Sequence, residues 1–554
     1  MPWTRPARWC LPLLLCSCQH DADVAASGGG SSGTGSGDSG DTTSTGSSST
    51  TTSADASSSG TPADSSSTAA TPDLPPPSCA PEGGGPWWLL EGDPLAVAIH
   101  CSTGVGDDAG FELAPLPAGA SYDDATATLS WTPGLDQGAV YDLTITSRAT
   151  GETAPLRIGV ADRWDDPANV PVVDETLYTF EFGLPVLHLH TDPTIGPDAY
   201  TPATTTYRGH VYTHEAKTRG AASLWYPKQS YTLKFTKDDK FDEPEFAGGF
   251  HDKRKIVLIS TFDDNAYVRQ RLAYELWNTL DAGHLQIQVY SAVVFKDGAY
   301  WGLYTVADHV DGYFMEDQGY LQTGNLYKAR THDANFRLAG KGTPHQGLTK
   351  EEGYPPAGQP GAFDDLDALV TFVDSSSDAA FDAQIDDWID RRDYEDWYVF
   401  VTLIMADDSA GKNSYHYHDP AGGPFRYAPW DFNDSFGQTW QTQRKGYQTH
   451  PEDYTWANEL FVRLLDSATF GQPLRTRYDA TLHDAYDVDA VLARYDAMVD
   501  ETAASALRDE GRWGEQYRNY GGWNWRDDFT TYDEEVQYVR QWIIDRWSFV
   551  DGVY

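Results

Sequence analysis

The sequence predicts an α+β domain over residues 173–554, preceded by a small all-β sandwich at 79–162 and a disordered tether at 18–78. From Ser27 to about Pro72 the chain is almost entirely Ser, Thr, Gly, Ala and Asp, a composition that cannot bury enough apolar surface to fold. The sandwich region holds short alternating runs separated by Gly, Pro and Asp, which is typical of two packed sheets. Beyond it, strand-like and helix-like apolar patterns are mixed, and the final third is mostly helical.

Residues 1–17 predict a lipoprotein signal peptide. Two arginines precede an apolar run that ends at Leu15 and is too short to span a bilayer. The Leu-Cys-Ser-Cys sequence that ends at Cys18 resembles a bacterial lipobox, so we expect a lipid on Cys18 to tether an exported protein to the membrane. Gln19 follows the cysteine, as in lipoproteins sorted to the outer membrane or cell surface. The alternative is a plain secretion signal that is cut further along the chain.

Charge and cysteine content agree with export. The formal net charge of -44 excludes general affinity for nucleic acid and fits a well-hydrated surface. Once the signal is removed and Cys18 is lipidated, Cys79 and Cys101 remain. An even pair in an oxidising compartment predicts one disulfide between them, within the sandwich.

The most informative stretch runs from Asp407 to Gly437. SYHYH and FRYAPW flank a Pro-Ala-Gly-Gly-Pro turn, which predicts a β-hairpin. An antiparallel hairpin returns the chain to its starting level, so Asn413 and Asp431 should lie side by side at its open end. With Asp408 nearby, these oxygen-bearing side chains suit a hard cation such as Mg²⁺.

The spacing of Asp408 and Asn413 also matches the protein-kinase catalytic loop. In that loop the Asp accepts the proton of the substrate hydroxyl, the Asn holds a metal, and a metal-binding Asp follows further on. A strongly apolar segment at 393–406 predicts a core helix that ends directly before the loop. The alternative is that Asp408 and Asn413 only shape a polar loop.

Basic residues gather in one part of this acidic chain. Eleven of the 39 Lys and Arg residues lie between Lys217 and Arg271. Such a concentration of cations is what an anionic ligand, for example a nucleotide polyphosphate, requires. Lys228, Lys234 and Arg271 sit within apolar and aromatic patterns, whereas a solvated Lys-rich strand and turn is the alternative for Lys237 and Lys240.

Several blocks together resemble the CotH (spore-coat protein H) kinase-like family. The matching blocks, in the family's order, are RGAASLWYPKQSYTLKF, YVRQRLAYELW, GAYWGLYTVADHVDGYF, GNLYKA, DSAGKNSYHYH and PWDFNDSFG. The resemblance implies an atypical protein-kinase-like fold with a helical C-terminal lobe. It also implies binding of ATP with a divalent metal, Mg²⁺ or Mn²⁺, and in some members transfer of phosphate to Ser of secreted or coat proteins. The segment around PLPAGASYDDATATLSWTPG resembles the Ig-like repeats of bacterial surface proteins.

The resemblance assigns roles to the residues around the hairpin. Asp408 corresponds to the essential catalytic Asp, Asn413 to its metal-binding partner, and Asp431 to the metal-binding Asp of the PWD motif. The family has Asp two residues after that position, where this chain has Asn433, with Asp434 one step later. Both are expected to supply metal ligands.

Five further residues are expected to contact the cofactor. Lys228 is the first choice for the phosphates, followed by Lys234 and Lys328. Arg271 stands where the family has Lys, and Asp308 where it has Glu. Each substitution keeps a cation or an oxygen ligand, so an active site remains the expectation.

The sequence thus predicts a secreted, membrane-tethered, metal-dependent kinase that transfers the γ-phosphoryl group of ATP to Ser or Thr of surface or secreted proteins. The competing interpretation is a non-catalytic pseudokinase-fold surface protein used for adhesion or for matrix or coat assembly. An Ig-like module beside the kinase-like domain and the scarcity of ATP outside the cytoplasm favour the second.

Overall fold

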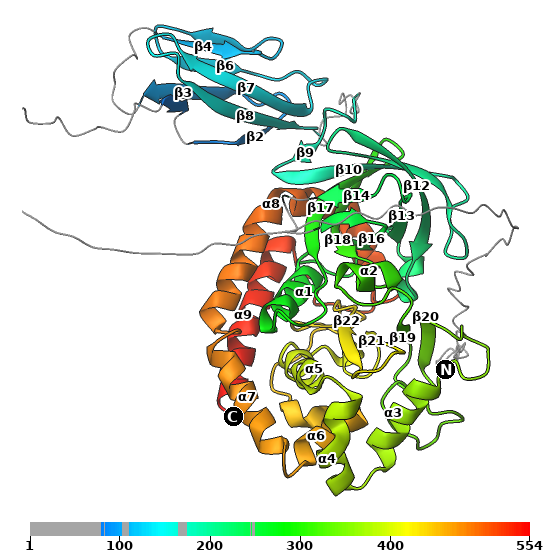
Figure 1. The fold of residues 1–554 in the computed structure, drawn as a ribbon. Coiled ribbons are helices and arrows are strands. Elements are labelled where there is room, and N and C mark those ends of the chain that lie inside the picture. Colours follow the sequence, from blue (N-terminus) through cyan, green and yellow to red (C-terminus); the bar gives the residue numbers. More distant parts are fainter. Residues whose placement is uncertain (1–78, 82–83, 102–109, 164–173, 244, 246–249) are drawn as a thin grey trace, which may run out of the picture. The chain divides into compact units, whose positions relative to one another are not determined.

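The computed structural model describes residues 79–81, 84–101, 110–163, 174–243, 245 and 250–554 (Figure 1). The predicted signal peptide and tether lie outside these described residues. Among the described helices, we find none with the length and apolar character needed to cross a bilayer.

The first folded region consists of two four-stranded sheets. One has the order β1-β3-β6-β5 and the other the order β2-β8-β7-β4. Inward side chains such as Ile99, Phe111, Trp131 and Ile158 form one apolar core, because alternate residues of each strand face inward. The strands are β1 (Cys79–Pro81), β2 (Trp87–Leu90), β3 (Leu95–Cys101), β4 (Phe111–Ala114), β5 (Ser121–Asp123), β6 (Thr128–Trp131), β7 (Ala139–Ser147) and β8 (Thr153–Ala161).

The two cysteines expected to form a disulfide face each other in this first region. Cys79 and Cys101 are Cα partners in the antiparallel pair β1·β3. The disulfide itself stays a prediction, as does the Ig-like relationship of the sandwich.

The larger region begins with an eight-stranded mixed sheet of order β11-β12-β13-β16-β18-β17-β10-β9. Only β10 and β17 pair in parallel among these neighbours. β17 and β18 form a hairpin, with Asp297 and Gly298 at left-handed φ angles of 52° and 81°, as a tight turn requires. The strands are β9 (Phe180–Glu181), β10 (Leu184–Thr191), β11 (Thr201–Tyr207), β12 (His210–Arg219), β13 (Ser230–Lys234), β16 (Lys255–Ser260), β17 (Val289–Lys296) and β18 (Ala299–Asp308), with a separate hairpin of β14 (Phe241–Glu243) and β15 (Phe250–Lys253).

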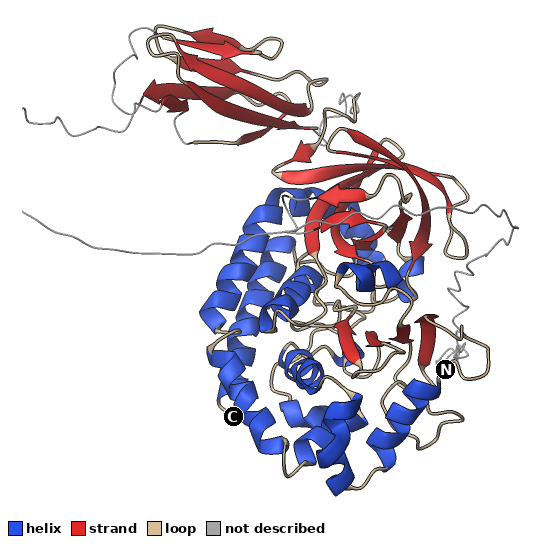
Figure 2. Cartoon of the chain, viewed as in Figure 1, coloured by secondary structure: helices blue, strands red, loops and turns tan. Residues whose placement is uncertain are grey.

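Helices make up most of the chain after this sheet (Figure 2). In α1, Leu272 and Leu276 are at most 1% exposed, and most of the other residues of this helix are buried as well. The helices predicted after Gly437 are present as α6–α9. The helices are α1 (Arg269–Leu280), α2 (Gly312–Asp317), α3 (Asp364–Ser375), α4 (Asp378–Trp388), α5 (Arg391–Leu403), α6 (Glu459–Asp466), α7 (Gly471–His483), α8 (Val488–Asn519) and α9 (Tyr532–Asp551).

A second, four-stranded sheet lies between the large sheet and helices α4 and α6 (Figure 1). Its order is β20-β19-β21-β22. The helix α5 packs on it, with the rings of Trp397 and Tyr427 stacked at 4.7 Å. This sheet carries the candidate site. Its strands are β19 (Asn325–Ala329), β20 (Leu348–Glu352), β21 (Ser414–His418) and β22 (Arg426–Pro429).

Candidate active site

The β21–β22 hairpin brings two of the predicted metal ligands to one place. Ser414, the first residue of β21, pairs with Pro429, the last residue of β22. Asn413 directly precedes the first strand, and Asp431 follows the second strand after a single residue. The predicted hairpin is therefore confirmed, and both side chains start from its open end.

Asp408 lies next to this open end on the short 3-10 helix η3 (Asp407–Ser409). The Oγ of Ser409 donates to the backbone oxygens of Trp430 at 3.2 Å and of Asp431 at 2.7 Å. Because Ser409 directly follows Asp408, these two hydrogen bonds hold the catalytic-loop candidate against the strand end. The three residues predicted from the spacing thus lie in one cluster.

Two residues of the cluster have an uncommon backbone conformation. Asn413 and Asp431 have φ angles of 51° and 64°, in the left-handed region that Asn and Asp tolerate best among non-glycine residues. Their backbone N–H groups donate to the carbonyl oxygen of Ala329 at 3.0 Å and to the hydroxyl oxygen of Tyr274 at 3.1 Å. Such strained conformations gather at functional sites. The substitution Asp431→Asn keeps a residue that tolerates this conformation.

The side chains at the hairpin mouth have no protein partner. In the part of the chain that the structure describes, the Asp431 carboxylate and the Asn413 amide form no hydrogen bond or ion pair. Burial raises the pKa of Asp431, the charge of Asp408 raises it further, and the charges of Lys328 and Arg219 oppose this. A half-buried carboxylate beside an amide oxygen, both without described protein partners, fits a hard cation such as Mg²⁺ or Mn²⁺.

Asp408 is held as a carboxylate. It forms an ion pair with Lys412 at 2.9 Å and lies 3.4 Å from Nε2 of His332. Burial by itself would raise the pKa of Asp408, but the interactions with His332 and Lys412 keep it below its ordinary value. A group that is ionised at neutral pH can orient a hydroxyl and accept its proton.

A further carboxylate, Asp263, belongs to the site and was not found from the sequence. Its Oδ2 accepts from Asn433 Nδ2 at 2.9 Å and from the Tyr226 hydroxyl at 3.3 Å. Burial raises the pKa of Asp263 to about 7, with added repulsion from Asp431 and Asp264. The sequence signal was an Asp-Asp-Asn run just after the apolar strand β16. Carboxylates at a strand end are candidate ligands, but only packing shows which of them face the site.

The two residues after the PWD motif have different surroundings. Asn433 donates to Asp263, which leaves its amide oxygen available to a cation. Asp434 instead pairs with Lys445, which also donates to the Met405 carbonyl at 2.8 Å. Burial raises the pKa of Asp434 to about 7, against the charge of Lys445. Asp434 therefore binds this neighbouring lysine, and it could hold a metal only if Lys445 moved away.

Lys328 is the one predicted phosphate-binding residue that lies beside the cluster. It sits on β19, opposite Tyr415 of β21. Its ammonium is 5.2 Å from the ring centroid of Tyr415 and 5.8 Å from that of Trp430. Burial, followed by the charges of Arg330 and Arg219, lowers its pKa to about 7. No described carboxylate forms an ion pair with it, so it can neutralise a bound anion.

Comparison with known proteins decides the family. The model of the family described as CotH kinase protein matches residues 216–550. The chain belongs to this family. The match contains every predicted site residue, together with Asp263, and the kinase-like domain is therefore the part of the chain that carries the site.

A curated relative also matches over this region. It is the inner spore coat protein H of Bacillus subtilis (strain 168), 22% identical over 338 residues. The match covers 60% of this chain and 84% of the relative.

The structure does not place the other two lysines expected from the CotH blocks at the cluster. The ammonium of Lys228 is buried and donates to Thr261 at 2.9 Å, to the Leu303 carbonyl at 2.6 Å and to Asp509. Its three donors are all used, so none remains for a phosphate, although the charge of Asp263 acts on it. Lys234 pairs with Glu215 at 3.3 Å on the neighbouring strand β12.

Arg271 and Asp308 are likewise engaged within the protein. Arg271 forms a bidentate pair with Glu501 of α8 at 3.0 and 2.9 Å and also binds Glu275. Asp308 accepts from the backbone N–H of Gln288 at 2.9 Å and pairs with Lys253 at 3.0 Å. Both residues therefore connect structural elements.

Proposed function

We propose that this CotH protein transfers the γ-phosphoryl group of ATP to Ser or Thr hydroxyls of surface or secreted proteins, with Mg²⁺ or Mn²⁺ as cofactor. One observation carries the proposal. Asp431 and Asn413 have no protein partner at the mouth of a hairpin, and an ionised Asp408 and an unpaired Lys328 lie beside them. An oxygen-lined cation site next to a free ammonium is what a metal-bound polyphosphate requires.

Asp431, Asn413 and the oxygen of Asn433 are the residues that would hold the metal. When bound, a divalent cation supplies charge neutralisation on the phosphate oxygens. Lys328 binds a phosphate from the β19 side of the hairpin. These groups are fixed by the backbone before substrate arrives, so they stabilise developing charge without reorganisation.

Asp408 is the residue that acts on the hydroxyl group of the protein substrate. The hydroxyl oxygen of the acceptor attacks the γ-phosphorus, its proton passes to the Asp408 carboxylate, and the bond from the γ-phosphorus to the bridging oxygen breaks to release ADP. Lys412 and His332 hold Asp408 in place. The transfer depends on positioning and electrostatics, as phosphoryl transfer generally does.

The location of this activity follows from the N-terminus and the relative. The predicted lipobox would tether the enzyme to the membrane through Cys18, outside the cytoplasm. The Bacillus relative is named an inner spore coat protein, which supports an exported or coat-associated site of action. We therefore expect protein substrates at the cell surface and no nucleic-acid partner.

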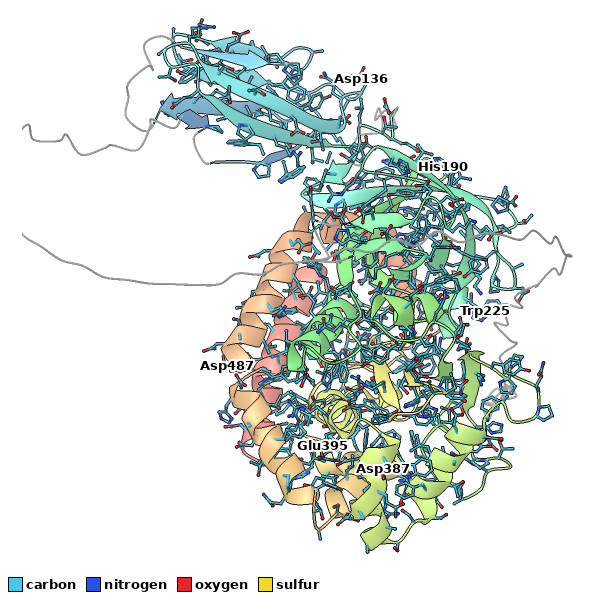
Figure 3. The ribbon with its side chains drawn as sticks, viewed as in Figure 1. Asp136, His190, Trp225, Asp387, Glu395 and Asp487 are labelled. Carbon is cyan, nitrogen blue, oxygen red and sulfur yellow. The ribbon has the colours of Figure 1, made fainter. Side chains whose placement is uncertain are left out.

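Phosphoproteomic comparison of cells that carry wild type, Asp408→Ala or a matched control tests the proposal. Asp387→Asn is a suitable control, because Asp387 is an exposed carboxylate on α4 (Figure 3). Phosphosites on surface proteins should disappear in the Asp408 variant and persist in the control. If the phosphosites are identical in all three strains, the transferase assignment is wrong and the non-catalytic surface role takes its place.

A further inference from the structure

The connection between β12 and β13 lies beside the candidate site, close to Trp430 and Asp263. Arg219, the last residue of β12, places its guanidinium carbon 4.7 Å from the ring centroid of Trp430. At the other end of the connection, the Tyr226 hydroxyl lies 3.3 Å from Asp263. Arg219, which directly precedes this β12–β13 loop (residues 220–229), and Tyr226 within it therefore both lie beside the candidate site.

Arg219 has an unusual lack of partners. Its Nη1 is buried and has no hydrogen-bond acceptor within the described residues, and no described carboxylate forms an ion pair with it. The more deeply buried Arg269 and Arg546 are satisfied: Arg269 binds Asp264 and Glu535, and Arg546 donates to four backbone carbonyls. Leaving a charged donor buried without an acceptor is costly. The arrangement therefore points to a missing anion.

A second cation, Lys328, lies near Arg219 and likewise forms no ion pair with a described carboxylate. Lys328 and Arg219 are both within 6 Å of the Trp430 ring centroid, at 5.8 and 4.7 Å. Two neighbouring cations repel each other, and the pKa of Lys328 is lowered to about 7 by burial and by the charges of Arg330 and Arg219. The chain has 83 acidic and 39 basic residues, so two adjacent cations without carboxylate partners are out of keeping with its composition. A bound polyanion would relieve this repulsion.

We propose that Arg219 is a phosphate-binding residue, which grips a phosphate of ATP together with Lys328 while Trp430 holds its guanidinium plane in position. This inference rests on the proposed ATP-dependent function and adds a residue to it. A planar guanidinium fork binds two phosphate oxygens at once. The contact with the Trp430 ring restricts the guanidinium before the nucleotide arrives, which lowers the entropic cost of binding.

The β12–β13 loop is built to hold Arg219 rigidly. Gly220 has a φ of 121°, and a Cβ at this position would lie 1.9 Å from the Ser223 Oγ. The short 3-10 helix η2 (Ala222–Trp225) follows, and Gln229 donates to the Leu224 carbonyl at 2.8 Å. Trp225 is 79% exposed and ends the helix (Figure 3). The loop is therefore a closed turn with its own hydrogen bonds, which presents the arginine from a fixed position.

Calorimetric binding of adenosine, AMP, ADP and ATP, with Mg²⁺ present, tests the inference on the full chain. For Arg219→Gln we expect ATP affinity to fall about tenfold to a hundredfold, as loss of a charge-assisted bidentate contact implies, while adenosine affinity stays unchanged. The ATP affinity of Arg219→Lys should lie between those of wild type and Arg219→Gln. Arg512→Gln is the matched control, because Arg512 also stacks on a tryptophan, Trp513, at 4.3 Å.

The outcomes separate the inference from the function on which it rests. If wild type binds ATP and Arg219→Gln binds it equally well, Arg219 is not a phosphate ligand. If wild type binds no nucleotide, the ATP-dependent function and the inference both fail. Should Arg219→Gln not fold, Arg219→Lys decides the matter: it keeps the charge but lacks the planar fork, and wild-type ATP affinity in this variant overturns the inference.

Discussion

Replacing Lys228 by methionine should weaken the fold and leave nucleotide binding intact. Lys228 is fully buried, and its partner Asp509 has a side chain only 2% exposed. Methionine removes the ammonium and leaves the Asp509 carboxylate buried without a cation, with only neutral partners, the Leu303 backbone N–H and the Tyr267 hydroxyl. Breaking one partner of a buried pair costs about 3–5 kcal/mol, and we expect a loss of that size.

A double-mutant cycle isolates the interaction. Asn at position 509 is neutral and can still accept from the Leu303 N–H, so Lys228→Met with Asp509→Asn should recover about 1–3 kcal/mol of the loss. The assay is urea unfolding at pH 7 of wild type, both single variants and the double variant, with free energies from linear extrapolation. ATP affinity is measured on the same samples.

The result that would refute this reasoning is specific. If the free energy of unfolding of Lys228→Met is within about 1 kcal/mol of that of wild type and the variant loses ATP affinity, then Lys228 contacts phosphate. The buried pair with Asp509 would not then be its main role. Such an outcome would restore the assignment made from the sequence.

Two further predictions concern pH. Contacts with Arg269 and Arg444 outweigh burial and hold the pKa of Glu535 at about 2, below its ordinary 4.5; this stability is present above pH 4.5 and is lost as pH falls towards 2. By pH 3 the free energy of unfolding should have fallen by about 2 kcal/mol through this group. Urea unfolding of Glu535→Gln between pH 7 and pH 3 should show a correspondingly smaller fall. An equal fall in wild type and variant would contradict the ion-pair account. Burial and the charge of Asp431 raise the pKa of Asp263 to about 7, so the negative charge that Asp263 adds beside the cation site is lost as pH falls below 7. Affinity for Mn²⁺ should be about tenfold weaker at pH 6 than at pH 8, and a titration of Asp263→Asn should lose most of that difference.

The local parts of the site could be predicted from the sequence because their causes are local. A Pro-Ala-Gly-Gly-Pro turn between two aromatic runs predicts a hairpin, and the hairpin alone places Asn413 beside Asp431. The apolar segment at 393–406 likewise predicted a core helix, and α5 spans Arg391–Leu403. In each case the pattern and its consequence lie within a few turns or one strand pair.

The contacts of individual charges could not be predicted in this way. Lys228 is bound by Asp509, 281 residues later, and Arg271 by Glu501, 230 residues later. A basic residue in an apolar pattern must be paired when buried, but the sequence does not say whether protein or ligand supplies the partner. The same limit hid Asp263, whose place in the site depends on Asn433, 170 residues away.

Binding of Mn²⁺ in the presence of a non-hydrolysable ATP analogue tests the central claim most directly. Electron paramagnetic resonance of free Mn²⁺ counts the bound ions in wild type, Asp431→Asn and the surface control Asp387→Asn. The account predicts that the control retains the tight nucleotide-dependent Mn²⁺ and that Asp431→Asn binds it at least tenfold more weakly, about 1.4 kcal/mol. Equal Mn²⁺ binding by wild type and Asp431→Asn would contradict a cation site at the mouth of the hairpin.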